Sequence, residues 1–454
     1  MSETLDVVII GAGFAGLAAA KQLSALGIDN FKILEARDRV GGRTKPGEIA
    51  GHTIDLGGMW LGPTQLHLKS LAEQYQVRTY PTWLDGKGIF KLGGKYAEGE
   101  REKLDALFGP LETLDYLNVS RKLNALVRSI NCEAPWDHER AKELDSMTVH
   151  DWISRNAKTE KLRHLFRFVS GAVFCAEPEQ MSMLFFVHYI ASGDDLDTLL
   201  SADSGGAQNF LFHGGVHQIA VKMSEELGER LHLNEAVSQI DWADDYADIT
   251  TSQGQYKARK VIIAVPLPLV TAVAFDPPLP AAKMALHKQM NMGSVIKIWV
   301  AYDRPFWREQ GFNGSIVRED SPVSPVFDVT PEDSKIGLIS GFFDADNAIE
   351  NSDLSQDERK QIVIDMLVEN FGTEARSPIA YQDNVWTNEQ WSGGCYGAYA
   401  PPGVYARYGE WLRKVIGPLH WAGTETSPKW TGYIDGAIQS GGRAAKEVSK
   451  HLAL

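Results

Sequence analysis

The sequence of 454 residues predicts a mixed α/β fold, and three features of the chain carry this prediction. A β-branched run at Val7–Ile10 is followed by apolar residues at helical spacing over Phe14–Leu26 and by a second apolar run at Phe31–Leu34, which is the pattern of a βαβ unit. A strand-rich region spans Leu231–Val265, and residues 100–200 between these blocks are mostly helical in pattern. Such a succession of blocks indicates mixed sheets covered by helices.

The later elements follow from the same patterns. Ala247–Thr251 alternates between apolar and polar residues, Gln253–Gln255 has the composition of a turn, and Val261–Val265 is typical of a buried strand. Helices are predicted over Leu104–Leu126, Ala141–Trp152 and Gly432–Leu452, the last with Ile438, Ala444 and Val448 facing inward.

Composition and charge exclude several classes of protein. The chain carries 45 Lys and Arg against 59 Asp and Glu, a net charge of −14, which argues against nucleic acid or an anionic membrane as partner. The longest apolar run, Val261–Phe275, contains two prolines and is shorter than the roughly 20 residues that span a bilayer. The first residues lack the basic region of a signal peptide, and three cysteines do not indicate a disulfide framework. We therefore expect a cytoplasmic protein.

A glycine motif follows the first predicted strand. Gly11, Gly13 and Gly16 form G-x-G-x-x-G between a strand and a helix, the context in which this motif indicates a dinucleotide. Gly11 permits the tight turn, Gly13 lets backbone N–H groups approach a pyrophosphate, and Gly16 allows close packing of the helix. Glu35 ends the second strand about 20 residues later, where a carboxylate binds ribose hydroxyls. A surface glutamate after a glycine-rich turn is the alternative for Glu35.

Further strings of residues resemble one known family. E-A-R-D-R-V-G-G-R-T begins at Glu35, W-S-G-G-C-Y begins at Trp391, and W-A-G-T-E-T begins at Trp421. These strings resemble the flavin monoamine oxidase family, and the resemblance covers nearly the whole chain. It implies a Rossmann-type FAD-binding domain that is discontinuous, formed by residues 1–80, 213–290 and 388–454. A substrate domain with a mixed sheet and helices would take residues 81–212 and 291–387.

The resemblance also implies which residues contact FAD. Paired glycines and a guanidinium at Arg43 suit a second contact with the phosphates, although a salt-bridged loop is the alternative. Cys395 is a candidate for a covalent thioether to the flavin, and a small buried cysteine that packs as a hydrophobe is the alternative. The implied cofactor contacts are Gly11, Gly13, Gly16, Glu35, Arg37, Gly42, Arg43, Gly58, Trp60, Val237, Trp391, Cys395, Gly423, Thr424, Glu425 and Tyr433.

The reaction centre implied by the resemblance contains Lys297, Tyr396 and Tyr433. The two tyrosines match an aromatic pair that flanks the substrate amine, and Lys297 matches a lysine that holds a water near the flavin N5. The rival interpretation of Lys297 is a surface lysine that points outward from its strand. Four residues are expected near the substrate: Ala172, Leu200, Gln208 and Phe327.

The implied reaction is transfer of a hydride equivalent from the amine α-carbon to the flavin, with oxygen as the electron acceptor. We expect a primary monoamine; a diamine or polyamine and a secondary or cyclic amine such as a nicotine-like alkaloid stay open. A flavin-dependent desaturase and a non-catalytic FAD-binding scaffold are the alternatives from other classes. No metal-binding motif or nucleophile elbow is found, and a homodimer is a family expectation.

Overall fold

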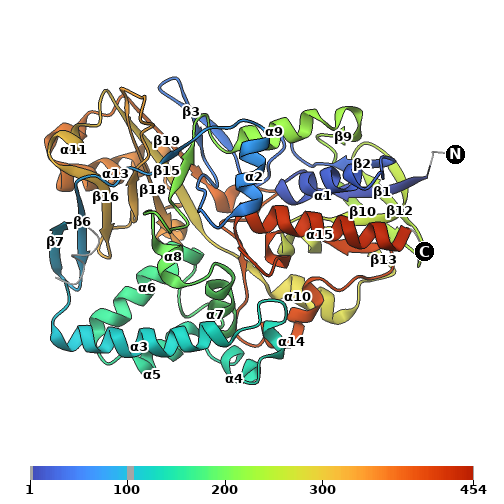
Figure 1. Cartoon of the computed structure of the whole chain (residues 1–454), viewed down its shortest axis with the longest axis horizontal. Coiled ribbons are helices and arrows are strands. Elements are labelled where there is room, and N and C mark those ends of the chain that lie inside the picture. The colour runs from blue at the N-terminus through green and yellow to red at the C-terminus, as the bar shows by residue number, and fades with distance from the viewer. Residues whose placement is uncertain (1–3, 100–106, 453–454) are drawn as a thin grey trace.

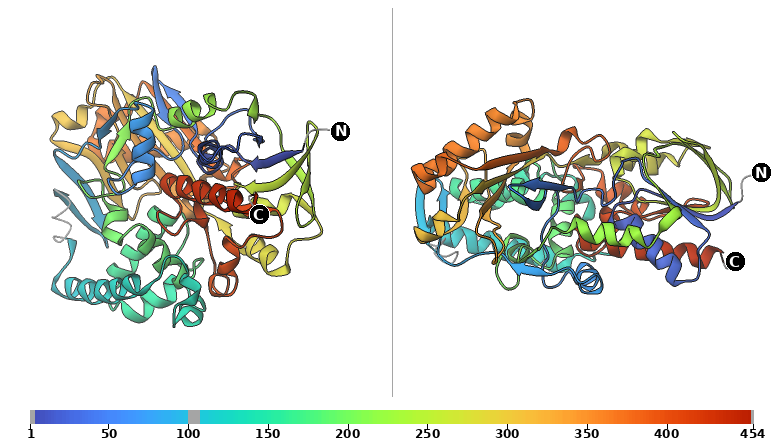
Figure 2. Two further views of the ribbon diagram at one scale, coloured as in Figure 1. Left: turned by 45° about the vertical axis from the view of Figure 1, so that its right-hand side comes forward. Right: turned by 90° about the horizontal axis from the view of Figure 1, so that it is seen from above.

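The computed structural model describes residues 4–99 and 107–452. Its two large sheets lie at opposite ends of the molecule, and a group of helices lies beside them (Figure 1). The two further views in Figure 2 show the same arrangement from the side and from above.

The first sheet has eight strands and contains the N-terminal βαβ unit. β1 (Leu5–Ile10) is at its centre and pairs in parallel with β2 (Phe31–Leu34) and β12 (Gln255–Ile263). Both faces of β1 are buried, which explains its continuous apolar run. The other strands are β9 (Leu231–His232), β10 (Val237–Trp242), β11 (Ala247–Thr251), β13 (Ala274–Asp276) and β21 (Leu419–Trp421).

Helices that are far apart in the sequence pack together on this sheet. α1 (Phe14–Ala25) and α15 (Ile434–Leu452) lie side by side (Figures 1 and 2), and α9 (His217–Glu225) contacts α1. The predicted strands and both helices of this part are confirmed, with differences of a few residues at their ends. The three residues predicted to face inward on the last helix are buried, namely Ile438, Ala444 and Val448.

The second sheet has seven strands and carries part of the site. β15 (Val295–Tyr302) lies between β18 (Gly337–Asp344) and β19 (Ala380–Val385) and is buried on both faces. One face packs against α13 (Gln356–Phe371), and Lys297 and Trp299 share the other face. The remaining strands and flanking helices are β6 (Lys87–Leu92), β7 (Lys95–Gly99), β16 (Phe312–Arg318), β17 (Val326–Asp328), α11 (Phe306–Glu309) and α12 (Ala345–Asn351).

The helical region is confirmed in class but corrected in detail. The predicted helix Ala141–Trp152 is wrong as one element, because it is divided into α4 (Ala141–Asp145) and α5 (Val149–Asn156). Thr148 is the N-cap of the second helix, since its hydroxyl accepts a hydrogen bond from the Asp151 N–H at 2.9 Å. An N-cap residue has a non-helical backbone, so one continuous helix cannot pass through Thr148. The predicted helix Leu104–Leu126 corresponds to α3 (Pro110–Ser129), and residues 104–106 lie outside the described residues.

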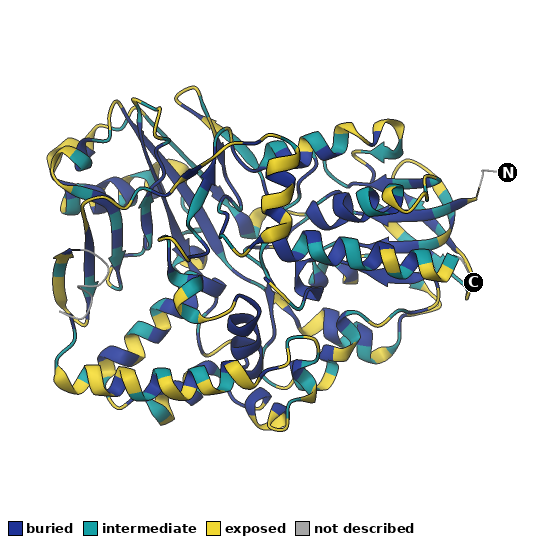
Figure 3. Ribbon diagram, viewed as in Figure 1, coloured by how far each residue is buried: buried dark blue, intermediate teal, exposed yellow. Residues whose placement is uncertain are grey.

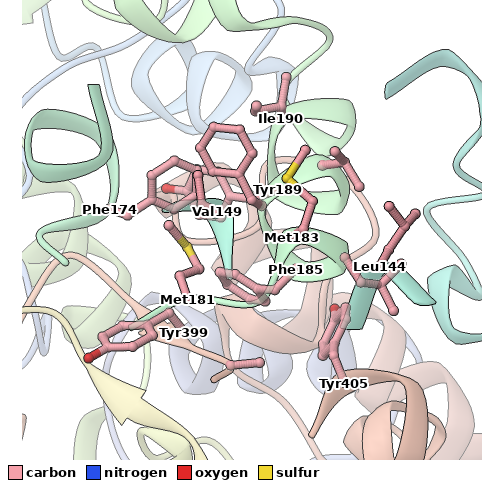
Figure 4. Close-up of a cluster of buried hydrophobic side chains, with 14 of the residues drawn as sticks. Leu144, Val149, Phe174, Met181, Met183, Phe185, Tyr189, Ile190, Tyr399 and Tyr405 are labelled. Carbon is pink, nitrogen blue, oxygen red and sulfur yellow. The ribbon is translucent and has the colours of Figure 1, made fainter. Parts of the chain in front are cut away.

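Helix α7 (Met183–Ser192) is the centre of this region. All of its residues are buried, whereas α3 exposes one side to solvent (Figure 3). Figure 4 shows Phe185 and Tyr189 of α7 packed among aromatic and sulfur-containing side chains that include Phe174 and Tyr405. α6 (Glu160–Phe174) and α8 (Leu196–Leu200) complete the group beside the site.

Short elements connect these parts. The domain bounds expected from the sequence stay a prediction. Within residues 4–99 and 107–452, no helix combines the length and apolar character that crossing a membrane requires. The short elements are β3 (Pro46–Ile49), β4 (His52–Asp55), α2 (Leu66–Gln74), β5 (Thr79–Pro81), β8 (Phe210–Phe212), α10 (Ala281–Gln289), β14 (Asn291–Met292), β20 (Ala398–Tyr399) and α14 (Tyr405–Tyr408).

The contact between α1 and α15 requires a glycine. A Cβ added at Gly441 would lie 2.0 Å from the carbonyl oxygen of Ala15, whereas one added at Gly442 would meet no atom within 4 Å. We predict that Gly441→Ala lowers stability by about 1–3 kcal/mol through overpacking. Gly442→Ala is the control, and it should stabilise the helix by up to about 1 kcal/mol. Thermal unfolding of the two variants checks this, and equal shifts would contradict it.

Candidate functional site

A single large cavity of about 1520 Å³ contains most of the predicted site residues. It is lined by both sheets, by the loop after β1 and by helices α6, α7 and α8. A pocket for one small molecule usually measures about 300–1,000 Å³, so this cavity has room for a dinucleotide together with a substrate.

The glycine motif forms one end of the cavity. Gly11 has φ +99°, and a Cβ there would lie 2.8 Å from the Ala264 carbonyl oxygen, so the turn excludes other residues. Gly13 precedes the first residue of α1, and a Cβ at Gly42 would come within 3.2 Å of its Cα. Two backbones therefore approach closely at a helix N-terminus, an arrangement that suits phosphate groups. Gly16 does not line the cavity, since it packs against the Gly11 carbonyl.

The predicted ribose ligand, Glu35, is buried and lines the same end. Its two carboxylate oxygens accept hydrogen bonds from the backbone N–H groups of Ala12 at 2.7 Å and Arg37 at 3.0 Å. These bonds orient the carboxylate, which can accept further hydrogen bonds from ribose hydroxyls because each oxygen has two lone pairs. Arg37 donates to Ser392 Oγ at 2.8 Å, and Val237 also lines the cavity.

A partly buried ion pair joins the N-terminal motif to the C-terminal segment. Arg43 Nη1 lies 2.7 Å from Glu425 Oε1 and donates to the Tyr396 carbonyl oxygen at 2.9 Å. Burial alone would raise the pKa of the Glu425 carboxyl, but the charge and hydrogen bonds of Arg43 lower it. Arg43 lines the cavity and Glu425 does not. Glu425 therefore holds the guanidinium from behind, and its expected role as a direct cofactor contact stays a prediction.

Lys297 lies in the cavity wall, and the rival interpretation as an outward surface lysine is wrong. Its side chain is 2% exposed, and its Nζ donates to the Gly57 carbonyl oxygen at 2.6 Å. Burial lowers the pKa of this ammonium, while the nearby Asp55 carboxylate raises it. Phe342, its cross-strand neighbour on β18, faces the cavity beside it.

Aromatic rings surround this lysine. The Trp60 ring contacts Phe327 at a centroid distance of 5.2 Å, and Phe342 contacts Tyr396 at 5.9 Å. The indole Nε1 of Trp60 is buried and has no hydrogen-bond partner among residues 4–99 and 107–452. A buried indole N–H usually has an acceptor, so this group is an unsatisfied donor in the wall of the cavity.

Tyr433 lines the cavity together with a tyrosine that the sequence did not single out. Tyr189 of α7 lies 6.0 Å from Tyr433 between ring centroids, and Trp430 lies 4.9 Å from it. Burial raises the pKa of the Tyr396 and Tyr433 hydroxyls, so both rings stay neutral. Tyr189 was missed because α7 is mostly apolar and is buried on every side, so no pattern separates a cavity residue from a core residue.

Cys395 also lines the cavity. It is 4% exposed, its Sγ lies 3.6 Å from the Tyr396 carbonyl oxygen, and burial raises the pKa of the thiol to about 12. The four residues expected near the substrate line the cavity as well: Ala172, Leu200, Gln208 and Phe327. So do the other expected cofactor contacts, namely Gly58, Trp391, Gly423 and Thr424.

The structure thus brings together every predicted site residue except Gly16 and Glu425, which support the wall from outside. No cluster of three His, Cys, Asp or Glu side chains that could hold a metal ion occurs in the described part of the chain. Phe342, Tyr189 and Asp55 were not singled out from the sequence. For Asp55 a signal existed, since a charged residue lies between the apolar Ile54 and Leu56.

Comparison with known proteins gives one consistent family. Residues 14–449 match the family described as flavin containing amine oxidoreductase. The flavin-containing amine oxidase of Danio rerio is 37% identical over 452 residues, which cover 98% of this chain and 86% of that protein.

Two solved structures are similar over almost their full length. The cyclohexylamine oxidase from Brevibacterium oxydans superimposes with a TM-score of 0.94 at 29% identity, covering 100% of both chains. A wild-type putrescine oxidase bound to putrescine gives a TM-score of 0.93 at 29% identity, with 98% of this chain and 99% of that chain covered. The fold is that of the FAD amine oxidases.

We predict that Glu425→Gln destabilises the protein by about 1.5–3 kcal/mol, because it leaves the partly buried Arg43 guanidinium without its counter-charge. Glu389→Gln is the matched control, since Glu389 pairs with Lys45 at 2.6 Å near the surface. Loss of the Glu389–Lys45 pair should lower the free energy of unfolding by about 1 kcal/mol or less. Denaturant unfolding of both variants measures the difference, and similar losses would contradict a special role for the Arg43 pair.

Proposed function

Because this chain belongs to the family of flavin-containing amine oxidoreductases, we propose that it oxidises a primary monoamine, aromatic or aliphatic, to an imine. Water then hydrolyses the imine to an aldehyde and ammonia, and molecular oxygen takes up the electrons as hydrogen peroxide. The observation that carries the proposal is the uncharged aromatic wall around Tyr396 and Tyr433. A homodimer and a cytoplasmic location stay predictions.

The wall selects for the neutral form of an amine. Tyr396 and Tyr433 are protonated because burial raises the pKa of both hydroxyls, so neither ring offers a negative charge to an ammonium ion. Their neighbours Phe342 and Tyr189 are also uncharged aromatic residues. A neutral amine has the free lone pair that transfer of a hydride from the adjacent carbon requires, so the cavity favours the reactive form.

The residues of the cavity fit FAD. The backbone cradle at Gly11 and Gly13 suits the pyrophosphate, and Glu35 suits the ribose hydroxyls. The bound flavin supplies a two-electron acceptor for the hydride equivalent. We propose that the Lys297 ammonium holds a water at the reactive edge, and that the chain orients the amine and excludes bulk water.

An amino acid is a poorer candidate substrate, because its carboxylate needs a free cation. Arg43 is paired with Glu425, and Lys297 donates to the Gly57 carbonyl. Arg43 is therefore committed to Glu425, and the remaining N–H donors of Lys297 are assigned to the water proposed above. The match to amine oxidoreductases over residues 14–449 likewise favours amine oxidation over a desaturase or a non-catalytic scaffold.

A diamine is the second candidate. Asp195 and Asp197 of the α8 region line the cavity, where a carboxylate can attract the distal ammonium of a diamine. Asp195 Oδ1 already accepts the Thr198 N–H at 2.8 Å, so part of its capacity is used to start the helix. A secondary or cyclic amine is the third candidate within the family.

The experiment that tests the function adds benzylamine, tyramine, putrescine or nicotine to the purified protein without oxygen and follows the flavin absorbance. We expect benzylamine or tyramine to bleach the flavin fastest, and admission of air to restore the absorbance with release of peroxide. Fastest bleaching by putrescine or nicotine would replace the monoamine proposal with the corresponding alternative. Bleaching by none of the four would overturn the proposal.

Lys297→Met should slow the reaction by about 10²-fold, which is the usual scale for loss of one proton-transfer or water-holding group. Lys91→Met is the matched control, because Lys91 lines the same cavity but is bound to Asp320. Stopped-flow measurement of flavin reduction and reoxidation checks this, and equal rates in both variants would remove Lys297 from the reaction.

We also propose that Cys395 binds the flavin covalently, because its thiol is buried in the wall of the cofactor cavity. Forming the thioether removes a proton from the thiol and a hydride equivalent from a flavin methyl group; the two electrons pass to the flavin and then to oxygen. Acid precipitation should leave the flavin with the wild-type protein and release it from Cys395→Ala. Cys175→Ala is the control and should retain the flavin as the wild type does. Release of the flavin from the wild-type protein would contradict the linkage.

A further inference from the structure

The segment Asp55–Gly57 is held by three side chains of the second sheet and the turn after it. The carbonyl oxygens of its three residues accept hydrogen bonds, in order, from Trp299 Nε1 at 3.0 Å, Trp386 Nε1 at 2.9 Å and Lys297 Nζ at 2.6 Å. All three donors are buried. The segment therefore has one position relative to β15, and Lys297 takes part in setting it.

The carboxylate of Asp55 is buried at the same place and points to a helix start. Both of its oxygens accept from the Val216 N–H, at 3.1 and 3.0 Å, just before α9. The N-terminus of a helix stabilises a negative charge, so these contacts favour the ionised carboxylate. Asp55 does not line the large cavity; it lines a separate cavity of about 230 Å³.

Lys297 needs a counter-charge because an isolated ammonium is costly to bury. Its Nζ binds the carbonyl oxygen of Gly57, two residues after Asp55, and two nearby groups raise its pKa, namely Asp55 and Cys395. The thiol of Cys395 is neutral, since burial raises its pKa to about 12. Asp55 therefore supplies the negative charge.

The groups that face Asp55 also leave Lys297 as its cation. Tyr80 is near it and stays neutral, because burial raises the pKa of its hydroxyl. His52, His213 and Asp333 line the second cavity with it, and His213 lies within 4 Å of Asp333 and Glu332. Burial raises the pKa of the Asp55 carboxyl, and the Lys297 ammonium opposes this shift.

We propose that Asp55 is the buried counter-ion of Lys297, a positioning residue that keeps the ammonium charged and directed at the large cavity. Asp55 reaches the reaction only through Lys297, because it lines a different cavity. Its effect on catalysis rests on the proposed role of Lys297 in amine oxidation. The proposed balance of charge between Asp55 and Lys297 does not depend on that role.

The first test measures the pair without any amine. Thermal unfolding of the holoenzyme is compared for wild type, Asp55→Asn, Lys297→Met and the double variant. Lys297→Met leaves a buried carboxylate unpaired, so adding Asp55→Asn should restore its Tm by roughly 2 °C or more. If the decrease in Tm of the double variant equals the sum of the decreases in the two single variants, the proposal is overturned, whatever the substrate is.

The second test measures the charge of Lys297. The flavin absorption spectrum is recorded against pH, and the transition that is absent from Lys297→Met is followed in Asp55→Asn. Loss of the carboxylate should lower the midpoint by roughly one pH unit, because the ammonium loses its stabilising charge. Asp333→Asn is the matched control, since Asp333 lines the same small cavity in an exposed position.

The outcomes separate the two proposals. A midpoint in Asp55→Asn that equals the Asp333→Asn midpoint would overturn the counter-ion. A shifted midpoint with an unchanged rate of flavin reduction by amines would support Asp55 as the counter-ion. It would also show that the charge of Lys297 does not affect the reaction rate.

Discussion

The ion pair between the cavity-lining Arg43 and the buried Glu425 is the interaction on which the arrangement of the site depends. The two residues are 382 positions apart in the chain, and the same guanidinium also donates to the Tyr396 carbonyl oxygen. Glu425 in turn accepts from the Ala398 N–H at 3.1 Å. A single charge pair therefore connects the N-terminal cofactor motif to the segment that carries Cys395 and Tyr396. Since a buried charge without a partner is costly, this connection tolerates little displacement.

Strand β15 places the chemistry because both of its faces are covered. Its Ile296 face packs against α13, so the opposite face has to meet the segment after β4. Lys297 lies on that second face and has its partners there, in the Gly57 carbonyl and the Asp55 charge. The strand thus provides a rigid support for an ammonium in a site that is otherwise apolar. Rigid support matters because a long lysine side chain has many rotamers to lose.

Charges are kept at the edges of the reaction space. Arg43 and Glu35 lie in the part of the cavity that suits the cofactor, Asp195 and Asp197 lie in the α8 region, and neutral rings surround Tyr396 and Tyr433. Low polarity around the amine strengthens the few electrostatic contacts that remain. Helix α7 contributes to this neutrality through Tyr189, which belongs both to the helical core in Figure 4 and to the cavity wall.

The sequence by itself determined the features that depend on near neighbours. The βαβ unit follows from the periodicity of a few residues. The tight turn at Gly11 follows from the glycine motif, and the φ of +99° at Gly11 confirms it. Motif resemblance located Arg43, Cys395 and Tyr396, and the cavity includes all three. The prediction of a single helix over Ala141–Trp152 was wrong. The signal that divides the helix is nevertheless local, because it is the N-cap at Thr148.

Only the tertiary structure decided which residues meet. Alternation along β15 could not show whether Lys297 faces solvent, because that depends on what covers each face of the strand. Its partner Gly57 lies 240 residues away, and no spacing in the sequence connects the two. The same holds for Asp55, which became a candidate only when folding placed its charge near that lysine. Burial and long-range pairing are properties of the packed chain, so local patterns do not contain them.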